Sequence, residues 1–183
     1  MSQESVDSAT FRAVMRHVPS PVVVVTANGA TEARGITIGS FTSVNLDPPL
    51  ICFNVGKQSQ MKGVMETCDR FCVHILGEGQ AYLAKHFAAP DLTGAEQFES
   101  VPHRRDAYGT PVIDGVTGTL HCVPHDAIDA GNHTVYVGRV VDVNVVTDDG
   151  GAVLYYQRSY RGVGKELRSS LLSPVNLASS DSS

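Results

Sequence analysis

A short stretch in the first third of the chain is rich in glycine and small hydroxyl residues. Residues 35–49 read GITIGSFTSVNLDPP, with Ser40, Thr42 and Ser43 following Gly39. Glycine permits close backbone approach, and short hydroxyls both donate and accept hydrogen bonds. Such a segment can bind the polar edge of a flat heterocycle, or a phosphate, through backbone N–H groups and uncharged side chains. The composition alone is equally that of a hairpin corner without a ligand.

Histidine and cysteine gather in the second half of the chain, at His121, Cys122, His125 and His133. A regular strand would place His121 and His125 on one face, but Pro124 interrupts it and Cys122 points the other way. Because this spacing matches no zinc signature, the sequence predicts no metal site. There is also no nucleophile elbow and no Gly-x-Gly-x-x-Gly after a strand, which argues against a serine hydrolase and a Rossmann pocket.

The composition is that of one globular domain. The chain has 183 residues, 42% of them hydrophobic and 18% charged, and no apolar run reaches the roughly 18 residues of a membrane span. The N-terminus lacks a basic leader and an apolar stretch, so we expect a cytoplasmic protein. A net charge of −5 with scattered basic residues argues against nucleic-acid binding. The four cysteines lie in apolar runs and are expected to be reduced and mostly buried.

Hydrophobic periodicity predicts short helices that alternate with strands. Helices are expected at residues 7–18, 59–68 and 79–90, with Asp7 or Ser8 and then Ser59 as N-caps. Strands are expected at residues 21–27 and 33–40, joined as a hairpin by Asn28-Gly29, and at 50–56, 70–76, 116–128, 132–146 and 152–160. Residues 91–108 are polar without a clear period and predict a surface loop or lid.

The strand at 132–146 alternates over its whole length. Its valines at 135, 137, 141, 143 and 145 share one face, and Thr134, Tyr136, Asp142 and Asn144 share the other. This pattern indicates an antiparallel sheet with an apolar and a wetter side. The whole pattern predicts a mainly β fold, a small antiparallel split β-barrel with peripheral helices. We expect this domain to span residues 11–164, between a flexible N-terminus (1–10) and a disordered tail (165–183).

Four segments, in order, resemble the flavin reductase family with the FMN-binding split β-barrel. They are GITIGSFTSVNLDPPLICFNVGKQSQM, GTPVIDG, GNHTVYVGRV and LYYQRSYRGVG. The match runs from about Phe11 to Gly164. The first motif is specific, whereas the others are informative mainly through their order. The resemblance implies a homodimeric NAD(P)H:flavin oxidoreductase that uses FMN, with FAD possible, and supplies reduced flavin to a partner monooxygenase.

The resemblance also implies which residues bind the flavin. In the family, the segment that matches Thr37 to Ser43 lies along the isoalloxazine ring and the ribityl chain, which implies contacts from Thr37, Ile38, Ser40, Phe41 and Ser43. The GKQSQM turn matches the loop that meets the flavin phosphate, which implies Lys57, Ser59 and Gln60. Phe87, Tyr160 and Arg161 match positions that border the flavin or the partner subunit.

His133 matches the family histidine near the nicotinamide and the flavin face. The family usually has Gly-Asp-His there, whereas this chain has Gly131-Asn132-His133. An amide cannot stabilise an imidazolium by charge. Hydride transfer does not strictly need an acid, because backbone donors can stabilise the flavin. We therefore expect activity to survive, with His133 positioning the nicotinamide, and NAD(P)H binding shallowly across the flavin.

Three other functions fit the same sequence. The chain could be an electron carrier that holds FMN tightly, a split barrel that binds haem or a deazaflavin, or a tailoring enzyme that transforms a small organic substrate on the flavin. The sequence does not separate NADH from NADPH.

Overall fold

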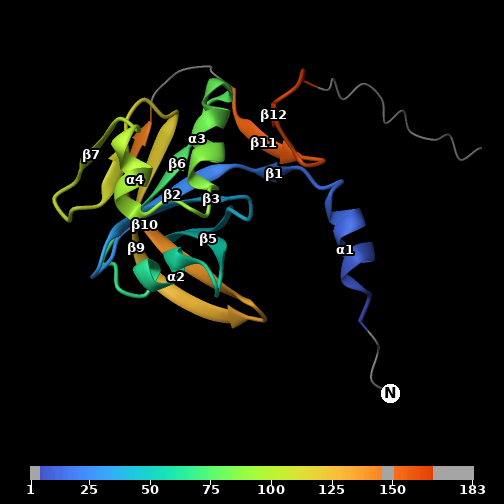
Figure 1. The fold of residues 1–183 in the computed structure, drawn as a ribbon, viewed down its shortest axis with the longest axis horizontal. Helices are drawn as coiled ribbons and strands as arrows, with labels where there is room; N and C mark the ends of the chain where they lie inside the picture. The colour runs from blue at the N-terminus through green and yellow to red at the C-terminus, as the bar shows by residue number, and fades with distance from the viewer. Residues whose placement is uncertain (1–4, 146–150, 167–183) are drawn as a thin grey trace, which may run out of the picture.

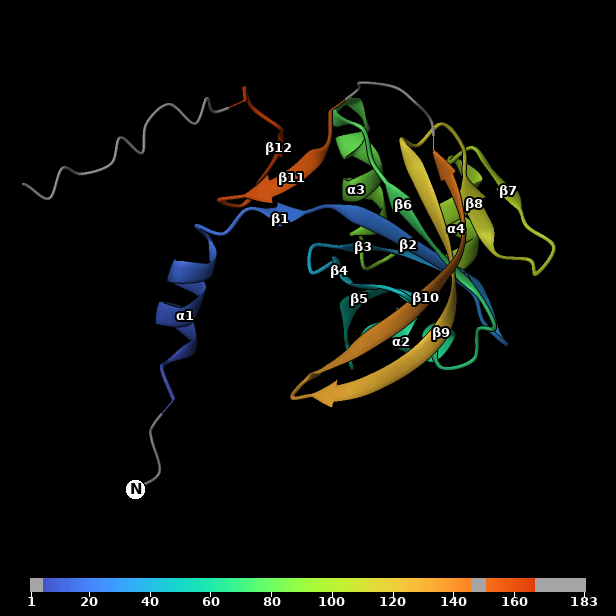
Figure 2. The same ribbon diagram turned by 180° about the vertical axis from the view of Figure 1, so that it is seen from behind.

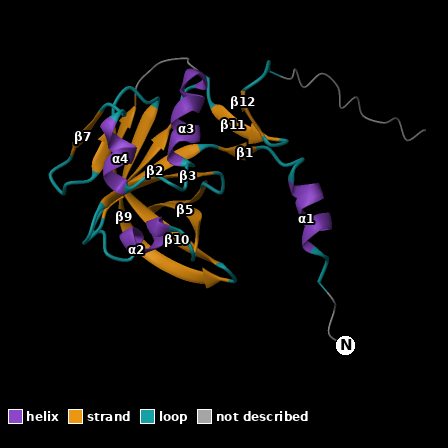
Figure 3. Ribbon diagram, in the orientation of Figure 1, coloured by secondary structure: helices purple, strands orange, loops and turns teal. Residues whose placement is uncertain are grey.

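The computed structural model describes residues 5–145 and 151–166, and it consists mainly of antiparallel strands with short helices at the periphery (Figures 1 and 3). The largest sheet has seven strands in the order β3-β2-β6-β9-β10-β5-β4. Its strands are β2 (Val23–Asn28), β3 (Ala33–Ile38), β4 (Thr42–Leu46), β5 (Pro49–Gly56), β6 (Phe71–Ile75), β9 (Gly118–Ala130) and β10 (His133–Val145). β3 at one edge contacts β5 near the other, so the sheet curls on itself. The predicted fold class is confirmed.

Smaller elements surround this sheet. The helices are α1 (Ser8–Met15), α2 (Gln60–Met65), α3 (Ala81–Phe87) and α4 (Gly94–Glu99), with a 3-10 turn, η1, at Glu78–Gln80. A three-stranded sheet has the order β1-β11-β12, formed by β1 (Ser20–Pro21), β11 (Val153–Tyr156) and β12 (Ser159–Gly162). A hairpin of β7 (His103–Arg105) and β8 (Pro111–Ile113) completes the described chain. Across residues 5–145 and 151–166, every helix is too short or too polar to cross a membrane.

The valine run of β2 is buried on both faces. Val23 and Val25 belong to a core inside the curled sheet, together with Phe53 and Phe71. Val22 and Val24 belong to a second core, beneath α3 and α4, which contains Leu76, Leu83, Phe87 and Phe98. A strand that is covered on both sides has no polar face, which explains why the run reads as continuous valine.

Several predicted elements are confirmed. β2 and β3 pair as a hairpin from Val23↔Ile38 to Asn28↔Ala33. Ser59 caps α2 by accepting a hydrogen bond from the Met61 N–H, and Asp7 caps α1 by accepting from Ala9 and Thr10. All four cysteines are free, and Cys68, Cys72 and Cys122 are buried whereas Cys52 is half-buried.

Two predicted segments are wrong in detail. Residues 91–108 were expected as a loop, but Thr93 and Glu96 form a capping box that begins α4, and β7 follows. Residues 152–160 were expected as one strand, but a turn at Gln157 and Arg158, both with positive φ, divides them into β11 and β12. Residues 8–10 were expected both within a flexible N-terminus and at the start of a helix at 7–18, and they form the first turn of α1. Most of the predicted tail, residues 167–183, lies outside the described residues.

The first half of β10 buries the face that was expected to be the wetter one, and the second half is exposed on both faces. Thr134 and Tyr136, expected on the wetter side, are each 5% exposed. Tyr136 lies opposite Phe53 on β5, and the two rings stack with centroids 6.1 Å apart. Val141 and Val143 on the expected apolar side are exposed, and a register shift between Val140 and Asp142 interrupts the alternation. Val141 and Val143 therefore expose apolar side chains on β10, which pairs with β9 in a long hairpin (Figure 2).

Candidate functional site

A cavity of about 510 Å³ lies beside β3, where α2, α3 and α4 all contact this edge strand. Three chain segments and one side chain from α4 line it. They are Arg34–Thr37 of β3, Gln58–Met61 at the start of α2, Phe87–Pro90 after α3, and Gln97. The volume falls within the roughly 300–1,000 Å³ that is typical of small-molecule sites.

Gln97 holds the backbone of the cavity wall in place. The Gly35 N–H donates to Gln97 Oε1 at 3.0 Å, and Gln97 Nε2 donates to the Gly35 carbonyl at 3.1 Å. Gln97 is only 2% exposed, so these bonds are buried. β3 is an edge strand whose outer N–H and C=O groups have no further strand to pair with. The side-chain amide therefore replaces a strand partner at Gly35.

Gly35 is also where a side chain would not fit. A Cβ built on Gly35 would lie 2.5 Å from both Cδ1 and Cε1 of Phe87. Phe87 is 2% exposed, and its ring packs against Phe98 with centroids 5.6 Å apart. Glycine at this position lets an aromatic ring lie directly against the strand.

Arg34 contributes a buried cation to the lining. Its Nε donates to Glu32 Oε1 at 2.9 Å, and its Nη1 donates to the Leu92 carbonyl at 3.1 Å. Glu32 Oε2 in turn accepts from the Gly94 N–H at the start of α4. The carboxylate of Glu32 therefore balances the guanidinium and ties β3 to α4.

Four of the predicted flavin-contact residues line the cavity: Thr37, Ser59, Gln60 and Phe87. The Thr37 hydroxyl donates to the Ala84 carbonyl of α3 at 2.6 Å, so its own hydrogen is already engaged. Ser59 Oγ accepts from the Met61 N–H at 3.2 Å. The cavity thus joins the two predicted segments, the one at residues 35–43 and the GKQSQM turn.

Four other predicted contacts lie outside this lining. Ile38 is 4% exposed and packs in the core inside the sheet, and Phe41 packs partly buried against the same core. Ser40 Oγ accepts from the Asn54 N–H at 2.9 Å, which ties the turn after β3 to β5. Ser43 is exposed on β4. Any ligand contact from Ile38 would therefore involve its backbone.

Lys57 and His133 lie close together at the C-terminal end of β5. His133 pairs with Gly56, and the Lys57 N–H donates to the Asn132 carbonyl at 2.9 Å. His133 is exposed, and its Nδ1 lies 2.7 Å from Asn132 Oδ1. Lys57 Nζ lies 3.2 Å from Asp129 Oδ1. Neither Lys57 nor His133 lines the cavity, but the chain continues directly from Lys57 into Gln58 and Ser59, which do.

Tyr160 and Arg161 lie on β12, in the three-stranded sheet. The Tyr160 ring is half-buried against the second core and lies 5.3 Å from the Tyr155 ring. The Arg161 guanidinium lies 5.9 Å from the centroid of the Tyr156 ring. Neither residue lines the cavity.

Sequence reasoning missed Arg34, Gln58, Gln97 and the Ala88–Pro90 segment. Gln97 lay in a stretch interpreted as a loop, although Thr93-x-x-Glu96 is a capping-box pattern that predicts a helix start. That pattern could have located α4. No sequence signal shows that Gln97 faces β3.

Known proteins resemble this chain over most of its length. A flavin reductase from Pseudomonas putida is 34% identical over 161 residues, which cover 87% of this chain and 92% of that protein. The solved structure of NADH:FAD oxidoreductase SgcE6 from Streptomyces globisporus has a TM-score of 0.80 and 31% identity, and covers 93% of this chain and 98% of its own. BorF, the flavin reductase component of a bacterial two-component tryptophan halogenase, has a TM-score of 0.78 and 31% identity over 87% of this chain and 100% of its own.

The family profile gives the same assignment as these individual proteins. It is described as the flavin reductase like domain, and it matches residues 15–164. That range includes the cavity, the GKQSQM turn and the β9–β10 hairpin, and it agrees with the resemblance found in the sequence. The chain therefore belongs to the flavin reductase like family.

Proposed function

We propose that this protein is an NAD(P)H:flavin oxidoreductase that transfers a hydride from a nicotinamide nucleotide to FMN or FAD. The observation that carries this proposal is the cavity beside β3, which joins four of the residues expected to contact flavin. Membership of the flavin reductase like family supports the same reaction. The relatives named above are flavin reductases, and one of them acts with NADH and FAD.

The residues present fit a flavin. The lining combines apolar groups, Met61, Phe87 and Pro90, with the uncharged hydrogen-bonding groups of Gln58, Ser59 and Gln60. A flavin has both characters, because its ring system is flat and largely apolar in its faces and polar at its edges. Gly35 gives the wall no side chain of its own, so the ring of Phe87 can approach the strand. We assign the binding of flavin to Thr37, Ser59, Gln60 and Phe87.

The role of the protein is to position the two reactants rather than to supply reactive groups. When bound, the flavin provides the hydride acceptor. The pair of Gln97 hydrogen bonds fixes the backbone of β3 at Gly35, and Phe87 and Pro90 give one part of the cavity an apolar lining. Holding two reactants in a fixed orientation can lower a barrier by about 7–11 kcal/mol.

We assign to His133 the positioning of the nicotinamide. Its exposed ring stands beside Gly56, on the segment that leads into the cavity lining, and Asn132 orients it through Nδ1. His133→Ala should raise KM for the nicotinamide nucleotide while leaving flavin affinity unchanged, and His133→Gln should restore part of the loss. A variant that loses flavin affinity instead would contradict this role.

The first experiment is steady-state oxidation of NADH and of NADPH, each with and without FMN, FAD and riboflavin. Turnover that depends on added flavin would support the reductase and identify both substrates. If FMN binds but neither nucleotide is oxidised, the protein is an electron carrier or a tailoring enzyme. An absorption spectrum of the purified protein separates both outcomes from a haem or deazaflavin protein.

Exposed apolar surface supports an assembly of two copies. Every residue of α1 is exposed, including Phe11 and Val14, and the helix projects from the body of the molecule (Figures 1 and 2). Val141 and Val143 add an outward apolar face on β10. We propose that a second copy covers these surfaces, and that the reduced flavin passes to a partner monooxygenase. Light scattering should give twice the mass of one chain, and a single-chain mass would overturn the dimer.

A further inference from the structure

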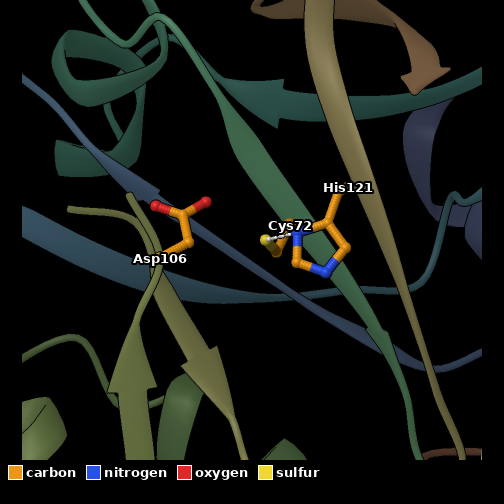
Figure 4. A group of neighbouring side chains, drawn as sticks. All are labelled: Cys72, Asp106 and His121. Carbon is orange, nitrogen blue, oxygen red and sulfur yellow. Dashed lines mark hydrogen bonds between the residues drawn. The ribbon is translucent and has the colours of Figure 1, made fainter. Parts of the chain in front are cut away.

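Three side chains with metal-binding atoms meet on the outer side of the central sheet, where the β7–β8 hairpin approaches it. Cys72 on β6 and His121 on β9 are paired directly across the two strands, and Asp106 follows β7 (Figure 4). The sulfur, one imidazole nitrogen and one carboxylate oxygen all lie within 4.8 Å of one another. None of the three residues lines the cavity beside β3.

The distances suit a tetrahedral ion. Cys72 Sγ lies 3.4 Å from His121 Nδ1. Zn²⁺ holds thiolate sulfur at about 2.3 Å and imidazole nitrogen at about 2.0 Å, so a tetrahedral centre separates these two atoms by about 3.5 Å. The ligand atoms lie within 4.8 Å of one another, and ligand atoms around zinc are about 3.5 Å apart, so the Asp106 carboxylate would have to approach by at most about 1.3 Å. Thiolate, imidazole and carboxylate are all ligands that zinc accepts.

Two of the three ligands, Asp106 and His121, are held by a second group. Asp106 Oδ1 accepts from the N–H groups of Tyr108 and Thr110, both at 2.9 Å, which leaves Oδ2 for another partner. Asn144 Nδ2 lies 2.8 Å from His121 Nε2. Zinc binding at His121 Nδ1 requires the hydrogen to be on Nε2, so the Asn144 amide must turn over and accept that hydrogen through its oxygen. Such outer partners typically orient metal ligands.

The charges of the cluster also favour a dication. The Asp106 carboxylate supplies a negative charge, and a Cys72 thiol that coordinates a metal loses its proton, so the bound ligands would balance the charge of a dication. The nearby cations are engaged elsewhere: Arg104 pairs with Asp114, and Arg70 lies over the Tyr108 ring at 3.8 Å. His121 and Asp106 are half-buried, so an ion can enter from solvent.

We propose that Cys72, Asp106 and His121 bind one Zn²⁺ ion, with water in the fourth position. The ion would tie the segment after β7 to β6 and β9, and its role would be structural. The sequence predicts no metal site from His121 and its neighbours along the chain. Cys72 comes to His121 through the pairing of β6 with β9, and Asp106 reaches both from the segment that follows β7.

The test is metal titration of the full chain after chelation and reduction. We expect one Zn²⁺ per chain by calorimetry, a rise in Tm with zinc, and a cobalt derivative with the thiolate charge-transfer and visible bands of a tetrahedral site. Cys72→Ser and His121→Gln should weaken zinc binding at least tenfold, whereas the matched control Cys52→Ser should bind zinc like the parent. Asp106→Asn tests the third ligand with little change in shape.

Several results would overturn the site. These are a parent chain that binds no zinc at micromolar concentration, a cobalt derivative without the thiolate band, or a Cys72→Ser variant with unchanged affinity. The cobalt spectrum of the parent decides the question even if a substituted chain fails to fold. The proposed role is structural, so flavin-dependent turnover of the zinc-loaded and zinc-free parent should be equal below the melting temperature of each.

Discussion

Replacing Gly35 with alanine tests whether the cavity wall needs a residue without a side chain. The new Cβ would lie 2.5 Å from two carbons of the Phe87 ring, whereas ordinary van der Waals contact begins near 3.4 Å. The ring must therefore move by about 1 Å. It cannot simply swing to solvent, because Phe87 is 2% exposed and packs against Phe98.

The expected cost is the difference between two opposing effects. Overpacking a buried site typically costs about 1–3 kcal/mol. The unfolded chain loses freedom when glycine becomes alanine, which stabilises the protein by about 0.4–1 kcal/mol. We expect a net loss of about 1–2 kcal/mol, which for a chain of this length lowers Tm by about 2–8 °C. Because Phe87 lines the cavity, flavin affinity should also fall, by about tenfold.

Gly63→Ala is the matched control. Gly63 lies within α2, and a Cβ there would meet nothing within 4 Å. This substitution should stabilise the chain by about 0.5–1 kcal/mol, because glycine is a poor helix former. Thermal melts and flavin fluorescence titrations of both variants give the two quantities. If Gly35→Ala melts at or above the parent temperature and binds flavin equally well, the account of this wall is wrong.

Three other predictions rest on separate contacts. Gln97→Leu leaves the N–H and C=O of Gly35 unpaired and should cost about 2–5 kcal/mol in urea unfolding, with weaker flavin binding. Burial lowers the pKa of His74 to about 3 from 6.5. As pH falls, His74 is therefore protonated in the unfolded chain before it is protonated in the folded protein. Between pH 6.5 and 3 the free energy of unfolding should fall by about 1.4 kcal/mol per pH unit. The loss of stability between pH 7 and pH 5 should be smaller by about 2 kcal/mol in His74→Gln than in the parent. Lys57→Ala should weaken FMN binding but not riboflavin binding in fluorescence titrations, because only FMN carries a phosphate.

The fold was largely predictable because most strands carry strong local signals. The valine run of β2, the Asn28-Gly29 turn and the Ser59 cap each favour one structure through short-range chemistry. The errors occurred where the signal was weak or distributed. The turn between β11 and β12 uses Gln157 and Arg158 at positive φ, where sequence patterns predict glycine or asparagine.

The orientation of β10 could not be read from its own residues. A β-strand has two faces, and alternation shows that they differ without showing which one meets the core. Tyr136 is buried because Phe53 lies opposite it on β5. Val141 and Val143 are exposed. The prediction assumed that the more apolar face of the strand is the buried one, and in this chain the contact of Tyr136 with Phe53 outweighs that tendency.

The sequence predicted which segments contribute to the candidate site, but it did not predict the contacts that hold the cavity wall in place. Thr37, Ser59, Gln60 and Phe87 follow from the resemblance, and the structure brings them to one cavity. Gln97 and Arg34 act through contacts with distant backbone groups, at Gly35 and Leu92. Such contacts depend on tertiary packing and leave no local pattern in the sequence.

The two cations near the cavity differ in how readily they can bind a phosphate. Arg34 is 7% exposed, and its guanidinium already bonds Glu32 and the Leu92 carbonyl. Separating a buried ion pair costs folding free energy, so we expect Arg34 to stay bound to Glu32 and to link β3 to α4. In the Lys57–Asp129 pair the lysine is half-buried and the aspartate is exposed, and pairs open to solvent contribute about 0–1 kcal/mol. Lys57 can therefore leave Asp129 for a flavin phosphate at little cost, and a flavin that arrives and departs as a substrate needs a contact of this exchangeable kind.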